Sequence, residues 1–133
     1  MVQISHLDHW VLTVRDIEAT CRFYSQVLGM AVITFGNNRK ALQFGHQKIN
    51  LHQAGAEIQP HADCPQPGSA DFCLMLVTPL EGAIAHLHAL NIAILVGPVQ
   101  RTGATGPIQS IYLRDPDGNL IELACPLSVE EPP

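Results

Sequence analysis

The hydrophobic and polar positions of this chain follow the same order of patterns in its two halves. In the first half, alternation over residues 7–14 predicts a strand, and apolar residues at helical spacing over 17–28 predict a helix. Asp16 is a favourable cap for the start of that helix, and Gly29 is a favourable residue to end it. Three further strands are predicted at residues 30–35, 41–44 and 48–53.

The second half begins with a predicted strand at residues 71–77. Thr78 and Glu81 have the spacing of a capping box with Pro79 at the first helical position, and Asn91 suits the left-handed end of a helix. The predicted buried stripe of this helix consists of Leu80, Ile84, Leu87 and Leu90. The remaining segments are strands at 92–96, 108–114 and 119–125, a glycine- and proline-rich loop at 97–107, and a frayed polar tail from Pro126.

Both halves therefore have the predicted order β-α-β-β-β, and the predicted fold class is α+β. We expect one domain over residues 1–133, in which the paired modules form a curved mixed sheet or half-barrel around a cup, with the helices outside. Module one covers 4–54 and module two covers 70–126. The linker at 55–69 is rich in proline and glycine, and it either connects the modules or lies over a site as a lid.

The composition is that of a globular domain, with 47% hydrophobic and 14% charged residues among 133. No apolar run approaches the ~18 residues of a membrane span, and residues 1–5 lack the features of a secretory signal. The four cysteines have no Cys-x-x-Cys spacing, so we expect reduced thiols and a cytoplasmic protein. The net charge of −5, without a basic cluster, argues against nucleic acid and anionic membranes as partners.

Laying the two halves on each other brings four polar strand residues to corresponding positions. These residues are His9, Asn50, Asp71 and Glu122. Each lies on the strand face opposite the one that packs on a helix. A register shift of one residue would put Phe72 in place of Asp71, but we expect Asp71 there because Phe72, Leu74 and Leu76 then form the core face.

Three stretches carry a resemblance to a known family. They are residues 7–16 (LDHWVLTVRD), 23–30 (FYSQVLGM) and 115–123 (DPDGNLIEL). Together with the repeated β-α-β-β-β order, they make the chain similar to the vicinal oxygen chelate superfamily. That superfamily contains glyoxalase I, fosfomycin-resistance thiol transferases, extradiol dioxygenases and bleomycin-resistance proteins, and the chain most resembles its small glyoxalase-domain members.

The resemblance implies a divalent metal held by His9, Asp71 and Glu122, with Asn50 as a possible fourth ligand. Asp71 departs from the histidine that the family usually has, and Asn50 departs from the glutamate of glyoxalase I. His52 shares the strand face of Asn50 and is an alternative ligand. Mixed histidine and carboxylate ligands suit zinc, nickel, manganese, iron or magnesium. The alternative for each residue is structural: a rim histidine, a turn-capping aspartate and a solvent-facing glutamate.

The first functional hypothesis is a metal-dependent lyase or isomerase of the glyoxalase type, acting on a small oxygenated or thiol-adduct substrate. Proton transfer would fall to Glu122 as the catalytic residue. The substrate-binding candidates are Tyr112, Arg114, Asn50 and His52. Small members of the family usually pair, so the resemblance implies a homodimer.

The sequence is also compatible with two other kinds of function. The chain is either a metal-free, ligand-sequestering protein of the bleomycin-resistance kind, for which the net charge of −5 suits a cationic ligand, or a thiol transferase or dioxygenase of the same superfamily. Asp71 counts against both enzymatic alternatives, because it replaces an expected histidine. A further hypothesis is a dimeric scaffold whose metal and substrate sites are degraded.

Overall fold

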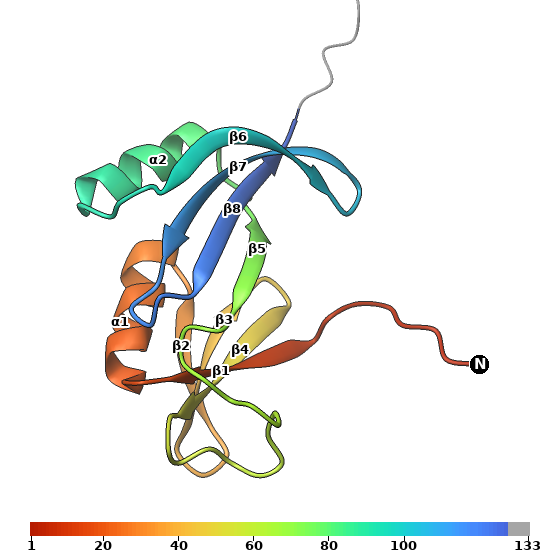
Figure 1. Ribbon diagram of the computed structural model, residues 1–133, viewed down its shortest axis with the longest axis vertical. Coiled ribbons are helices and arrows are strands. Elements are labelled where there is room, and N and C mark those ends of the chain that lie inside the picture. Colours follow the sequence, from red (N-terminus) through yellow and green to blue (C-terminus); the bar gives the residue numbers. More distant parts are fainter. Residues whose placement is uncertain (128–133) are drawn as a thin grey trace, which may run out of the picture. The chain divides into compact units, whose positions relative to one another are not determined.

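The computed structural model describes residues 1–127, in which two helices and eight strands follow the β-α-β-β-β order twice (Figure 1). The elements are β1 (His9–Val14), α1 (Ile17–Leu28), β2 (Ala31–Phe35), β3 (Arg39–Phe44), β4 (Gln47–Gln53), β5 (Asp71–Met75), α2 (Leu80–Ala89), β6 (Val96–Gly103), β7 (Gly106–Arg114) and β8 (Leu120–Pro126). The polar tail predicted from Pro126 lies outside the described residues except for Pro126, which ends β8, and Leu127.

The chain divides into two compact units, each with its own mixed sheet. The first unit contains residues 1–70 together with 116–118, and its strands are ordered β1-β4-β3-β2. The second unit contains residues 71–115 and the chain from Asn119, and its strands are ordered β5-β8-β7-β6. The predicted α+β class and the repeated module are confirmed, and the strands form two four-stranded sheets, one in each unit.

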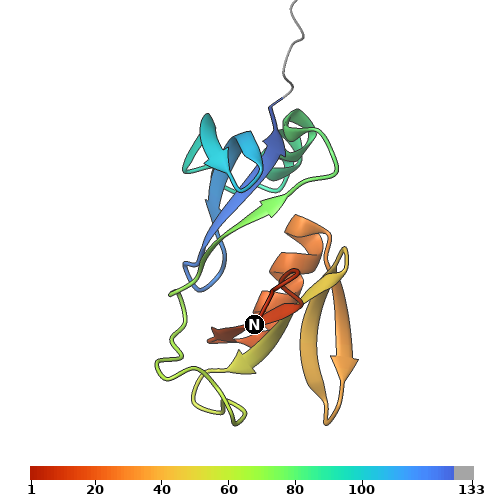
Figure 2. The same ribbon diagram turned by 90° about the vertical axis from the view of Figure 1, so that its right-hand side faces the viewer.

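In the first unit, β1 runs parallel to β4, while β2, β3 and β4 pair in antiparallel fashion. Helix α1 packs against β2, β3 and β4, as Figure 2 also shows. The core beneath it is apolar and almost free of solvent; its largest members are Tyr24, Leu42, Ile49 and Leu51. Burial of these side chains is the main stabilising contribution to this unit.

The ends of α1 form as the sequence predicts. The Asp16 carboxylate accepts a hydrogen bond of 3.1 Å from the backbone N–H of Ala19, which satisfies one free donor of the first turn. Gly29 has φ +68°, the left-handed conformation that ends a helix with little strain in glycine. Both predicted caps are confirmed.

The second unit repeats the arrangement, with β5 parallel to β8 and with β6, β7 and β8 antiparallel. Helix α2 contacts β8. Its predicted stripe is only partly correct, because Leu80 and Leu87 are buried whereas Leu90 is 42% exposed. Leu90 is the C-cap residue that follows the helix.

The predicted capping box of α2 is wrong. The residue at the N-cap position is Pro79, and no side chain caps the first turn. The proline ring offers no acceptor, and Thr78 lies one residue too early to occupy the cap. The predicted helix end is correct, because Asn91 has φ +57°.

The strand predicted at 92–96 and the loop predicted at 97–107 are also wrong. Strand β6 runs from Val96 to Gly103 and pairs with β7 through an irregularity between Val96 and Val99. Gly97 has φ +112°, and any side chain there would collide with the backbone of Ser110. Gly97 and Pro98 therefore form a bulge that interrupts the pairing without ending the strand.

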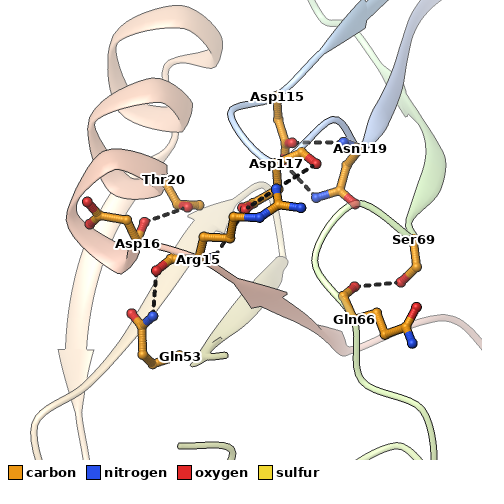
Figure 3. A network of polar contacts seen from close by, with 9 residues as sticks. All are labelled: Arg15, Asp16, Thr20, Gln53, Gln66, Ser69, Asp115, Asp117 and Asn119. Atoms are coloured by element: carbon orange, nitrogen blue, oxygen red, sulfur yellow. Dashed lines mark hydrogen bonds and ion pairs between the residues drawn. The ribbon is translucent and has the colours of Figure 1, made fainter. Parts of the chain in front are cut away.

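The turn between β7 and β8 is held by its two aspartates, as Figure 3 shows. The Asp115 carboxylate accepts hydrogen bonds from the backbone and side-chain N–H groups of Asn119, at 2.9 and 2.8 Å. Within the first unit, the Asp117 carboxylate accepts a 3.0 Å hydrogen bond from the backbone N–H of Arg15. It also forms an ion pair of 3.3 Å with the Arg15 guanidinium. These contacts give the Asp-Pro-Asp-Gly turn a structural role.

Two further sequence expectations concern thiols and membranes. The four cysteines are free, in accord with the expectation of reduced thiols. Neither α1 nor α2, the helices of the described chain, is long and apolar enough to cross a membrane.

Candidate functional site

In the first unit, the predicted site residues lie on the sheet face that points away from α1, which we call the helix-free face. Strand pairing sets Asn50 beside Val11 and His52 beside Thr13, while His9 lies beside Lys48. Paired residues of neighbouring strands share a face, so His9, Asn50 and His52 project on the same side. The alternate residues Ile49 and Leu51 are buried in the core.

The second unit has an equivalent helix-free face. Asp71 pairs with Leu120, and Glu122 lies between Cys73 on β5 and Tyr112 on β7. Arg114 pairs with Leu120 from the other side, so it lies in the same row as Asp71. This register puts Asp71, and not Phe72, on the face of Glu122.

His9 is oriented by its sequence neighbour. The Asp8 carboxylate accepts a 2.8 Å hydrogen bond from Nδ1 of His9, and this bond holds the pKa of Asp8 below its ordinary value. Because an ionised carboxylate only accepts, Nδ1 of His9 is the donor of this bond, and the neutral ring then has its lone pair on Nε2. A carboxylate that holds the far nitrogen of an imidazole is the usual outer-shell partner of a metal-binding histidine.

Glu122 is half-buried and held by two neighbours. The fully buried Ser110 hydroxyl donates a 2.5 Å hydrogen bond to its Oε2, and the Cys73 thiol also hydrogen-bonds to the carboxylate. Burial, together with the charge and hydrogen bond of Glu122, raises the pKa of Cys73 to about 11. Cys73 therefore stays protonated at neutral pH and is no nucleophile, as the sequence indicates. Ser110 is a contact that sequence analysis missed.

Asn50 and His52 are almost completely buried, at 6% and 3% exposure. Arg39 donates a 3.4 Å hydrogen bond to Nε2 of His52, and burial together with this guanidinium lowers the pKa of the imidazole. Oδ1 of Asn50 and Nδ1 of His52 have no hydrogen-bond partner within residues 1–127. Buried polar atoms without partners are rare and call for a ligand or an ordered water.

The two predicted substrate contacts of the second unit differ in their surroundings. The Tyr112 hydroxyl accepts a 3.1 Å hydrogen bond from Nε of Arg101, whose guanidinium lies 5.5 Å from the tyrosine ring centroid. Arg114 is exposed. Arg101 was assigned to a loop by the sequence pattern, so its contact with Tyr112 was not predicted.

A cationic and aromatic cluster on the helix-free face of the first sheet was missed entirely. Nζ of Lys48 lies 3.8 Å from the ring centroid of Phe35, and the Arg39 guanidinium lies 4.9 Å from the same centroid. The signal for Lys48 was present, because it alternates with Asn50 and His52 on β4. Arg39 was missed because the predicted strand began two residues later.

The donor atoms at the four predicted metal positions fit a divalent cation: an imidazole nitrogen, two carboxylates and a buried amide oxygen. The first unit supplies His9 and Asn50, and the second supplies Asp71 and Glu122. Among the described residues, no group of three histidine, cysteine, aspartate or glutamate side chains is placed to hold a metal ion.

The chain is a paired-module protein. It has two β-α-β-β-β modules, and each module has polar side chains at matching positions on its helix-free face. Residues 6–123 match the model of the Glyoxalase/Bleomycin resistance protein/Dioxygenase superfamily. This chain belongs to that superfamily.

Among its relatives is the virulence protein STM3117 of Salmonella typhimurium, which is 56% identical over 91% of this chain and 84% of that protein. Its crystal structure has a TM-score of 0.93 at 54% identity, covering 95% of this chain and all of that chain. The glyoxalase domain-containing protein RDO1 of Mycosarcoma maydis is 53% identical over 92% of this chain and 69% of that protein.

Proposed function

We propose that this protein is a divalent-metal-dependent enzyme of the glyoxalase type, a lyase or isomerase that acts on a small oxygenated or thiol-adduct substrate. The observation that carries the proposal is the equivalence of the donor positions. His9 in the first module corresponds in register to Asp71 in the second, and Asn50 corresponds to Glu122. All four side chains belong to the helix-free faces, where strand alternation separates them from the core.

The metal ligands of the proposed site are His9, Asp71 and Glu122, with Asn50 as the fourth. His52 is not a ligand in this proposal, because its Nε2 already accepts a hydrogen bond from Arg39. The hydrogen bond from His9 to Asp8 supports a ligand role, because it leaves Nε2 available. The unpartnered Oδ1 of Asn50 supports a role in binding metal or substrate. When bound, zinc, nickel, manganese, iron or magnesium supplies Lewis acidity toward a substrate carbonyl.

Glu122 is the proposed catalytic base, because its carboxylate is half-buried and is hydrogen-bonded by residues of the neighbouring strands. The Ser110 hydroxyl holds one oxygen of Glu122, and the protonated Cys73 thiol offers a second hydrogen bond. Asn50 cannot accept a proton in this role, since a carboxamide is not basic at neutral pH. A single base therefore serves the proton transfer.

Substrate binding in this proposal involves Tyr112 and Arg114 on the second sheet and His52 on the first. Arg101 fixes the orientation of the Tyr112 ring through its hydrogen bond to the hydroxyl. The exposed Arg114 would supply positive charge toward a substrate anion.

The test is elemental analysis of protein purified without chelator, beside the double variant His9→Ala, Glu122→Ala. The matched control is His46→Ala, Glu81→Ala, which removes the same residue types from an exposed turn and an exposed helix position. We expect nearly one metal per chain in the wild type and in the control, and close to none in the site variant. Protein with metal would then be assayed with α-ketoaldehyde–thiol adducts, epoxides and catechols.

Wild-type protein that stays free of metal after incubation with Mn²⁺, Ni²⁺ or Zn²⁺ would overturn the proposal. In that case the metal-free sequestering function becomes the better hypothesis, and the experiment to follow is a search for a ligand that co-purifies. Equal metal loss in the site variant and the control would also contradict the assigned ligands.

A further inference from the structure

Two cations lie on the helix-free face of the first sheet, although the chain as a whole carries a net charge of −5. Arg39 on β3 and Lys48 on β4 both lie against the ring of Phe35, at 4.9 and 3.8 Å from its centroid. The aromatic ring holds both cations by cation–π attraction, and it accepts few of their hydrogen bonds. Their N–H donors therefore remain available to a ligand.

Neither of these cations is neutralised by a carboxylate. The side chains of Arg39 and Lys48 form no ion pair with an aspartate or glutamate in the described part of the chain. The pKa of the Asp8 carboxyl is lowered mainly by its hydrogen bond with His9, and the charge of Lys48 contributes only slightly. Two half-buried cations without a paired anion are unusual, because burial without a partner is costly for a charge.

Buried donors without acceptors lie at the same place. The guanidinium of Arg39 only donates, so Nε2 of His52 accepts from it and the His52 ring proton is on Nδ1. That Nδ1 donor is buried and has no partner in residues 1–127, and the same holds for Nε of Arg39. The His52 side chain is almost completely buried, with 3% of its surface exposed. Two unsatisfied N–H donors beside unpaired positive charge are complementary to an anionic oxygen group.

We infer that the helix-free face of the first sheet binds the oxyanion of a small molecule, a carboxylate or phosphate-type group, through Arg39, His52 and Lys48. Arg39 and His52 donate hydrogen bonds, and Lys48 contributes charge. This inference rests on the proposed function in that it names the charge of the substrate for the same site. Binding of the anion requires only the first unit, so it is measurable without metal.

The experiment uses chelator-treated full-length protein and two probes, inorganic phosphate and malonate, titrated at constant ionic strength. Binding is followed by calorimetry and by the NMR signals of the His52 ring. The test variants are Arg39→Gln and Lys48→Gln. The control is Lys40→Gln, which removes one positive charge from β3 on the opposite face, where Lys40 donates a 2.7 Å hydrogen bond to Thr34.

We expect saturable binding of at least one probe to the wild type, with a shift of the His52 ring signals. Each test variant should weaken binding by about tenfold or more, since a charge-assisted contact is lost. The control should stay within about twofold of the wild type, because it changes only the distant field. If only phosphate binds, the natural ligand group is a tetrahedral anion. If only malonate binds, the ligand group is a carboxylate.

Absence of saturable binding by both probes would overturn the inference, as would equal weakening by Lys40→Gln. Lys48→Gln keeps the test valid if Arg39→Gln fails to fold. Metal content is measured on the same variants: a variant that loses anion binding but retains metal separates this inference from the proposed function. Wild-type protein that binds the anion but no metal supports the anion site and contradicts the metal-dependent reaction.

Discussion

At the scale of single residues, neighbouring polar groups determine what each candidate side chain does. Nδ1 of His9 donates to Asp8, and Nε2 takes no part in that bond, whereas Cys73 beside Glu122 keeps its proton. Ser110 completes this local arrangement, because its buried hydroxyl donates to the same carboxylate. The contacts of Glu122 with Cys73 and Ser110 depend on strand pairing, which brings these residues together. The contact between His9 and Asp8 is local, because the two residues are neighbours in the sequence.

The reactivity of Cys73 is the prediction at this scale. Glu122→Gln removes a negative charge and a charged acceptor, so the raised pKa of about 11 should fall and the thiolate fraction should rise. Burial persists, and the pKa therefore returns only part of the way to the ordinary value of a cysteine thiol. We expect iodoacetamide to alkylate Cys73 roughly three- to tenfold faster at pH 8 in the variant.

The rates are read by mass spectrometry on chelator-treated protein, with the exposed Cys64 as the internal reference. Glu81→Gln is the control, because it removes a carboxylate from the exposed surface of α2. An unchanged rate at Cys73 in Glu122→Gln would show that the carboxylate does not act on the thiol.

At the scale of elements, close approach between backbone segments sets requirements that local patterns do not reveal. The linker residue Gly68 has φ +81°, and an added Cβ would lie 2.6 Å from the carbonyl oxygen of Asp117. Asp117 is in turn held by the backbone and guanidinium of Arg15 (Figure 3). The linker and the turn thus depend on each other's backbone within the first unit.

A pair of glycine substitutions tests this dependence. Gly68→Ala should lower the free energy of unfolding by about 1–3 kcal/mol, because it adds both backbone strain and a collision. Gly82→Ala lies inside α2 with nothing within 4 Å, so it should raise that free energy by about 0.5–1 kcal/mol. Urea unfolding followed by circular dichroism measures both, and a Gly68→Ala protein as stable as the wild type would refute the argument.

At the scale of the whole molecule, the repeated module determines how chemistry is distributed. Each unit carries two of the four proposed metal ligands, and the charges differ between the sheets. In register, Lys48 of the first sheet corresponds to Leu120 of the second, and Asn50 corresponds to Glu122. A duplicated fold can in this way keep its packing pattern on one face while the other face diverges. The core residues Ile49 and Ile121, at matching positions, are both fully buried.

Assembly is the prediction at this scale, and we propose that the protein is a homodimer. In the strand order, β1 and β2 are the outermost strands of one sheet, and β5 and β6 are the outermost strands of the other. Apolar residues on or near β5 are exposed, with Met75 at 52% and Val77 at 103%. Light scattering after size exclusion should give about twice the 14.5 kDa chain mass, and a monomer at all concentrations would contradict the proposal.

The elements whose signals are local could be predicted from the amino-acid pattern alone. The order β-α-β-β-β, the Asp16 and Gly29 caps, and the division of each strand into a core face and a polar face follow from periodicity and from single-residue conformational preference. The polar faces in turn indicated His9, Asn50, Asp71 and Glu122. The family resemblance named the chemistry for these positions, and their joint action is still a proposal.

Features that depend on partners far away in the chain could not be predicted locally and are seen first in the folded structure. Strand β6 forms through a Gly-Pro segment because β7 supplies its hydrogen bonds, which no local pattern encodes. In the cluster of Phe35, Arg39 and Lys48, Phe35 and Arg39 are paired in register, whereas Lys48 pairs with Gln43 and contacts the Phe35 ring from β4. The empty hydrogen-bonding positions of His52 and Arg39 become visible only when every neighbour is in place, because a donor lacks a partner only relative to the whole surrounding structure.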